Sequence, residues 1–68
     1  MNQINVALGR HIRLARESKG SLQKDLAQAA GLPVRTIGRI ERGEVDVRLS
    51  TLAKIAVALG VPLKELMP

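Results

Sequence analysis

The sequence predicts an all-α fold of five short helices packed as one small domain. Sixty-eight residues are enough for a single small core. Apolar residues recur at the helical spacing i, i+3, i+4 and i+7 along much of the chain. A glycine follows each of the first four predicted helices, and glycine commonly ends a helix because it enters the left-handed conformation without steric cost. Since the chain is 46% hydrophobic without an aromatic residue, the core is expected to be aliphatic and rich in alanine.

The predicted helices, in chain order, cover about residues 5–19, 23–30, 33–42, 50–59 and 62–67. Residues 1–4 are expected to fray. Apolar stripes identify the first and fourth helices: Leu8, Ile12 and Ala15 in the first, and Leu52, Ile55, Ala56 and Leu59 in the fourth. The apolar residues of the last helix are either core residues or part of a dimer surface: Leu63, Leu66 and Met67.

Residues 23–43 organise the chain and predict two helices joined by a tight turn. The first of these helices carries the apolar stripe Leu26, Ala27 and Ala30. Gly31 follows the stripe and is expected to end the helix. Pro33 then suits the start of the next helix, because its fixed φ is already helical and its missing N–H is not needed there.

The second of these helices, about residues 33–42, has two different sides. Ile37 and Ile40 lie three residues apart and predict an apolar side that faces the core. At about 100° per residue, the opposite side carries a small aliphatic residue, a glycine and two arginines: Val34, Gly38, Arg35 and Arg39. A helix side of this size and charge can enter a groove.

The net charge of +5 is unevenly distributed. Residues 1–43 hold eight of the eleven Lys and Arg but only three of the six Asp and Glu, whereas the rest of the chain is neutral. The excess therefore lies on the half that contains the two helices joined by the turn. This coincidence favours a polyanion as partner over a surface that is merely solubilising.

Several classes of function are disfavoured. The chain has no cysteine, and His11 is its only histidine, so neither a disulfide nor a metal site is expected and His11 is predicted to be a surface residue. No apolar run reaches about 18 residues and the N-terminus lacks a signal-peptide pattern, which points away from a membrane and towards the cytoplasm. Without a glycine-rich phosphate loop or a nucleophile motif, we expect no enzyme, no catalytic residue, no cofactor and no small-molecule substrate.

The order of residues in this region resembles the helix-turn-helix of the phage repressor and Cro family, within the xenobiotic-response-element-like group. The matching positions are Gln23, Leu26, Ala27, Ala30, Gly31, Leu32, Thr36, Ile37, Ile40, Glu41 and Gly43, and the match continues through residues 49–66 and back to Leu8, Ile12 and Arg16. It covers nearly the whole chain. The resemblance implies one domain over residues 1–68, a compact five-helix lambda-repressor-like DNA-binding domain with its helix-turn-helix at about 23–42.

The resemblance also implies roles for individual residues. The helix at about 33–42 would read bases in the major groove. Val34 would contact a thymine methyl, and Arg35 and Arg39 would each bind a guanine, unless those arginines contact phosphates only. Gly38 would allow close approach. The expected phosphate contacts are Gln23, Thr36, Arg42, Arg48 and Arg10. Arg16 and Glu41 would form a structural pair between the first helix and the recognition helix, rather than being two unrelated surface charges.

Three places depart from the family pattern. Ser21 and Leu22 are exchanged relative to the usual order of an apolar residue followed by a hydroxyl cap, so the second helix starts either after Leu22 or one residue early with Ser21 as its cap. Pro33 stands where the family often has Ser or Thr. Glu44 and Asp46 put acids in a loop that is often basic or polar in the family.

The sequence thus predicts a sequence-specific double-stranded DNA-binding transcriptional regulator, acting as a repressor and as a homodimer on a pseudo-palindromic site. Two alternatives remain open. One is an antitoxin or restriction–modification controller that regulates its own operon. The other is a protein-interaction module that kept the fold and lost DNA binding, which the acidic loop and the altered second helix support. The expected location is the cytoplasm, in association with the nucleoid, for a protein of a prokaryote or a phage.

Overall fold

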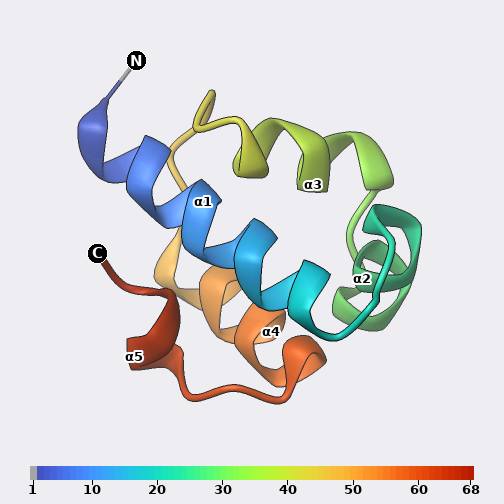
Figure 1. The fold of residues 1–68 in the computed structure, drawn as a ribbon. Coiled ribbons are helices and arrows are strands. Elements are labelled where there is room, and N and C mark those ends of the chain that lie inside the picture. Colours follow the sequence, from blue (N-terminus) through green and yellow to red (C-terminus); the bar gives the residue numbers. More distant parts are fainter. Residues whose placement is uncertain (1) are drawn as a thin grey trace.

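The computed structural model describes residues 2–68, and this part of the chain folds into five helices without a strand (Figure 1). The helices are α1 (Gln3–Ser18), α2 (Gln23–Ala30), α3 (Val34–Glu41), α4 (Leu49–Leu59) and α5 (Leu63–Leu66). The α1 helix packs against α3 on one side and against α4 and α5 on the other, while α2 packs against α3 and α4 (Figure 1). The prediction of an all-α, five-helix domain is confirmed.

The first helix begins earlier than predicted. Asn2 is its N-cap, and the side-chain Oδ1 accepts hydrogen bonds from the backbone N–H groups of Ile4 at 2.7 Å and Asn5 at 3.3 Å. An N-cap asparagine satisfies amides that a helix otherwise leaves unpaired. The expectation that residues 1–4 fray was therefore wrong for residues 2–4, and Met1 lies outside the described residues.

One aliphatic core joins all five helices. Every predicted stripe of α2, α3 and α4 is buried, and Leu66 of α5 is fully buried. Leu66 is thus a core residue and cannot belong to a shared surface. Met67, by contrast, is 45% exposed. The buried apolar residues are Leu8, Ile12, Leu26, Ala27, Ala30, Ile37, Ile40, Leu52, Ile55, Ala56, Leu59 and Leu66.

Two glycines allow α1 and the end of α3 to approach closely. A Cβ atom on Gly9 would lie 2.7 Å from the carbonyl oxygen of Glu41 and would overlap that of Ile40. Gly43 has a φ of +73°, and a Cβ there would lie 2.8 Å from the Cα of Val6. Because the neighbouring atoms are backbone, they cannot move aside as a flexible side chain would. The two glycines therefore set the distance between α1 and the C-terminal end of α3.

At the start of α2, the positions of Ser21 and Leu22 show which of the two residues caps the helix. Leu22 is the N-cap residue and 56% exposed, and its side chain offers no hydrogen bond to the helix. Its backbone N–H donates to the Asp25 carboxylate at 2.9 Å, which is one half of a capping box. Ser21 is half-buried, and its hydroxyl reaches only the Leu22 carbonyl at 3.4 Å. The helix therefore starts after Leu22, and the alternative with Ser21 as the cap is wrong.

The double variant Ser21→Leu/Leu22→Ser is expected to be more stable than the parent by about 0.5–2 kcal/mol, because it adds a hydroxyl cap and fills a half-buried position with an apolar side chain. Urea denaturation midpoints of the two proteins measure the difference. The single variant Leu22→Ser is the control that isolates the contribution of the cap. A double variant with a midpoint at or below that of the parent would contradict the prediction.

Candidate nucleic-acid interface

The core fixes which side of α3 faces outward. Ile37 and Ile40 are 1% and 3% exposed, so they anchor the helix on the core. On the other side Val34 is 49% exposed, and Arg35 and Arg39 are also exposed. The helix begins at Val34 rather than at residue 33, because Pro33 is the N-cap and adopts extended backbone. The structure thus presents two arginines and a valine together on one exposed face of a short helix.

Gly38 is covered by two neighbouring side chains. It is buried, and a Cβ there would lie 3.0 Å from Nη1 of Arg42 and 3.8 Å from Oε1 of Gln23. Gly38 therefore lies beneath the side chains of Gln23 and Arg42 and not on the open face with the arginines. Arg42 lies one helical turn after Gly38, as the helical period predicts, whereas Gln23 reaches it from α2. That Gly38 allows close approach to DNA stays a prediction.

A buried ion pair ties α3 to α1. Nε of Arg16 lies 2.6 Å from Oε2 of Glu41, and Nη2 of Arg16 donates to Oε1 of Glu41 at 3.0 Å. The two side chains are only 10% and 3% exposed. The hydrogen bond to Glu41 raises the pKa of Arg16 above its usual value. Two parallel hydrogen bonds fix both distance and angle, so this pair holds α3 in one orientation against α1.

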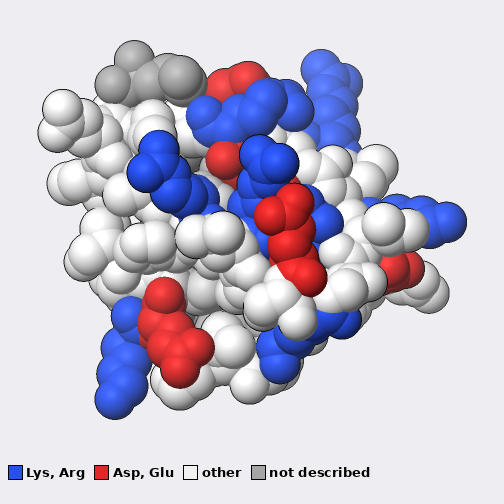
Figure 2. Space-filling view, viewed as in Figure 1, with Lys and Arg blue, Asp and Glu red and all other residues white. Residues whose placement is uncertain are grey.

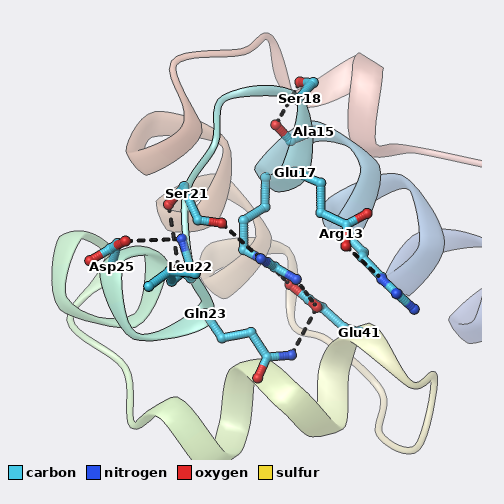
Figure 3. Close-up of polar contacts among 10 residues, drawn as sticks. Arg13, Ala15, Glu17, Ser18, Ser21, Leu22, Gln23, Asp25 and Glu41 are labelled. Carbon is cyan, nitrogen blue, oxygen red and sulfur yellow. Dashed lines mark hydrogen bonds and ion pairs between the residues drawn. The ribbon is translucent and has the colours of Figure 1, made fainter.

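The same pair also positions the start of α2. Arg16 Nη1 donates to the carbonyl of Ser21 at 2.8 Å, and Gln23 Nε2 donates to Oε1 of Glu41 at 3.0 Å. Figure 3 shows Ser21, Gln23 and Glu41 converging from the α1–α2 loop, α2 and α3 on this cluster. No buried side-chain nitrogen or oxygen in the described residues lacks a hydrogen-bond partner. Only one of the two N–H bonds of the Gln23 amide is used here, so the other can donate outward.

A polar pocket of about 250 Å³ opens beside this cluster, lined by Arg13, Arg16, Gln23, Glu41 and Arg42. Arg13 and Arg42 have side chains 62% and 59% exposed. Two exposed guanidinium groups next to a free amide N–H form a setting that suits a phosphate. Arg13 was not among the expected phosphate contacts, because its place beside Arg42 in this pocket depends on how α1 packs against α3.

Basic side chains gather around α3, with acidic side chains among them (Figure 2). Arg10 is exposed one helical turn before Arg13 on α1, and Arg48 is exposed at the N-cap of α4. Thr36 is half-buried in the first turn of α3. The structure therefore leaves Arg10 open to solvent on α1, which packs against α3, and Arg48 open to solvent at the end of the loop that connects α3 to α4.

The two acids of the loop after α3 are both engaged within the protein. Glu44 lies 2.6 Å from Nε of Arg42 and 3.9 Å from Nε of Arg39, and the hydrogen bond from Arg42 lowers the pKa of Glu44 below its usual value. Asp46 accepts a hydrogen bond from Nδ2 of Asn5 at 2.7 Å. The acidic loop is thus folded back onto α1 and α3.

His11 is not a plain surface residue as predicted. It is half-buried, and its Nδ1 lies 3.3 Å from the carbonyl oxygen of Leu66, which links α1 to α5. In the part of the chain that the structure describes, no three His, Cys, Asp or Glu side chains group as a metal site would require. Among residues 2–68, no helix combines the length and the apolar character needed to cross a bilayer.

A helix-turn-helix with an outward-facing basic second helix, held by a buried ion pair, defines the class of helix-turn-helix DNA-binding transcriptional regulators. Comparison with known families supports this class. The chain matches the HTH_3 helix-turn-helix family over residues 12–66, and it belongs to that family. The resemblance stated from the sequence is confirmed. The family is one of DNA-binding regulators rather than of enzymes.

Three known proteins are similar over almost the whole chain. Control protein C.BamHI of Bacillus amyloliquefaciens is 39% identical over 97% of this chain and 83% of its own length. The crystal structure of the restriction–modification controller protein C.AhdI from Aeromonas hydrophila has a TM-score of 0.94 at 35% identity, covering 97% of this chain and 100% of that one. A hypothetical transcription factor from Neisseria meningitidis is 34% identical over 94% of this chain, which spans only 60% of that relative's length.

Proposed function

We propose that the protein is a sequence-specific double-stranded DNA-binding repressor that reads the major groove with α3. One observation carries this proposal: the buried isoleucines and the Arg16–Glu41 pair fix α3 with Arg35 and Arg39 facing outward. The B-DNA major groove admits an α-helix, and an arginine fork matches O6 and N7 of guanine. Val34, at the start of the same face, suits a thymine methyl.

The surrounding side chains would grip the phosphate backbone. The proposed contacts are Arg10, Gln23, Thr36, Arg42 and Arg48, to which the pocket between α1 and α3 adds Arg13. These contacts would set the register of the protein on the duplex and supply the salt-dependent part of the affinity. Repression would then follow from occupancy, because a bound protein excludes other proteins from the same stretch of DNA. DNA binding and repression would take place in the cytoplasm, on the nucleoid.

We expect two copies of the chain to bind DNA together as a homodimer. An apolar pocket of about 340 Å³ lies where the start of α1, the start of α4 and the C-terminus meet, and three of its lining residues are large and exposed: Ile4, Leu49 and Met67. Exposed apolar surface of this kind suits a twofold contact between identical chains. Such a homodimer would read a pseudo-palindromic site with half-sites about one helical turn apart.

A restriction–modification controller that regulates its own operon is the second candidate. It is favoured by the similarity to C.BamHI and by the match to C.AhdI, whose entire chain is covered. An antitoxin would be compatible with the same site, but no feature of the described residues favours it. The protein-interaction alternative loses part of its support, because both loop acids are paired within the protein rather than free for a partner.

Selection from a random pool of duplexes, followed by sequencing, tests the proposal. We expect enrichment of one motif made of two inverted half-sites about one helical turn apart. The matched control is the variant Arg35→Ala/Arg39→Ala, which should fold but enrich no motif. A single half-site would contradict the dimer. No enrichment by the parent at low salt would contradict DNA reading and favour the interaction module.

A further inference from the structure

Glu44 lies at a position where a negative charge is electrostatically unfavourable. It follows Gly43 at the C-terminal end of α3, and its backbone N–H donates to the carbonyl of Arg39 at 3.0 Å. The C-terminal end of a helix carries partial negative charge, so a carboxylate there is disfavoured. The same carboxylate would also face the phosphates of a duplex bound along α3. The backbone hydrogen bond to Arg39 nevertheless fixes the backbone of Glu44 relative to the helix.

Two arginines on α3 and at its end offset this cost. Oε2 of Glu44 lies 2.6 Å from Nε of Arg42, and Oε1 lies 3.4 Å from Nη2 of the same residue, so one whole edge of that guanidinium is occupied. Oε1 also lies 3.9 Å from Nε of Arg39. Arg42 and Arg39 are the residues that the proposed function assigns to phosphate and to base contact.

The two arginines are affected differently by this carboxylate. For Arg42, a phosphate must compete with Glu44 or use the remaining edge of the guanidinium. For Arg39, the carboxylate approaches from the Nε side, so the far edge with its two terminal nitrogens stays free. That far edge can make the bidentate contact with a guanine end-on. Glu44 therefore weakens the phosphate contact of Arg42 and orders the side chain of Arg39 for its contact with a base.

We infer that Glu44 is a specificity-determining residue, which weakens binding to DNA of arbitrary sequence more than binding to the preferred site. The inference rests on the proposed DNA-reading function. Non-specific binding comes almost entirely from Lys and Arg neutralising phosphates, so a carboxylate that occupies Arg42 acts directly on it. On the preferred site the ordering of Arg39 offsets this loss, because less conformational freedom is lost when the guanine contact forms.

The test uses Glu44→Gln, which keeps the size of the side chain and removes its charge. We expect affinity for a scrambled duplex to rise about 3- to 10-fold at low salt, and its salt slope to steepen by about one unit as Arg42 becomes free for a phosphate. Affinity for the selected motif should change by less than about 2-fold. The matched control is Glu65→Gln, which makes the same change in net charge on α5, on the other side of the molecule from α3 (Figure 1).

Several outcomes would overturn the inference. Equal gains on both duplexes, or an equal gain for Glu65→Gln, would mean that only net charge matters. A large loss on the motif alone would mean that Glu44 itself accepts a hydrogen bond from a base, as a carboxylate can from cytosine. In an Arg42→Gln background the gain from Glu44→Gln should disappear, and an undiminished gain there would exclude action through Arg42.

The proposed function can fail separately from this inference. If the parent binds no duplex at low salt, DNA reading is wrong. If the parent binds the motif selectively and Glu44→Gln leaves both affinities unchanged, only the inference is wrong. Thermal unfolding of each variant checks that the fold is intact, which is expected because the side chain of Glu44 is 40% exposed.

Discussion

Replacing Arg16 with methionine is expected to lower the free energy of unfolding by about 3–4 kcal/mol, because it leaves the Glu41 carboxylate buried without its charged partner. That carboxylate is only 3% exposed, and among residues 2–68 Gln23 would be its one remaining side-chain hydrogen-bond donor. A domain of this size holds about 3–5 kcal/mol in total. The variant should therefore be largely unfolded at room temperature, and urea titrations in a stabilising salt or osmolyte would measure the loss.

A double-mutant cycle separates the pair from its surroundings. Arg16→Met/Glu41→Met should cost less than either single change, since it removes both charges and keeps the volume. The matched control is the exposed pair on α1, where Nε of Arg13 lies 3.2 Å from Glu17 and the side chains are 62% and 48% exposed. Arg13→Met should cost less than about 1 kcal/mol. Additive effects of the Arg16 and Glu41 substitutions would mean that the pair contributes no coupling energy.

Replacing Arg39 with alanine is expected to weaken binding to the preferred site by about 1–3 kcal/mol and to relax discrimination at one base pair. The physical reason is the orientation of α3: Ile40 lies buried next to Arg39 in the sequence, while the Arg39 side chain remains 48% exposed on the outer face. The loss on a scrambled duplex should be much smaller. Arg35→Ala should act on a neighbouring base pair, because Arg35 lies one turn closer to the start of α3.

Titrations on preferred and scrambled duplexes at two salt concentrations distinguish base reading from phosphate contact. Arg13→Ala is the control, since Arg13 lines the polar pocket and should show phosphate behaviour. For that variant the loss should be similar on both duplexes and the salt slope should fall by about one unit. Equal losses on both duplexes for Arg35→Ala and Arg39→Ala would refute base reading by these arginines.

Most of the fold could be predicted from local patterns. Apolar stripes at helical spacing place Ile37, Ile40 and Ile55 in the core, and all three are buried. The errors lie at helix ends, where one side chain decides the boundary. Asn2 caps α1 and extends it by two residues beyond the predicted start. The beginning of α2 depended on whether Ser21 or Leu22 serves as the cap, and periodicity cannot distinguish adjacent residues at a terminus.

The candidate site was predicted in part. The outward side of α3 follows from the helical period, because burying two isoleucines leaves Arg35 and Arg39 on the opposite side. The burial of Gly38 follows only in part: Arg42 lies one turn further along the same helix, but Gln23 comes from α2. The pocket that includes Arg13 was also missed, because its residues come from three helices.

The sequence by itself determined the helices, the turn at Gly31 and the basic half of the chain, because period, helix-ending glycines and charge are properties of neighbouring residues. The tertiary structure decided what requires two distant segments to meet. Gly9 looks like a weak point inside a helix, and only the crossing of α1 over the carbonyls of Ile40 and Glu41 explains it. Likewise, the sequence shows Glu44 only as an acid in the loop after α3, and the tertiary structure shows that its carboxylate contacts Arg39 and Arg42. Coulomb interactions depend on distance in space and not on distance along the chain.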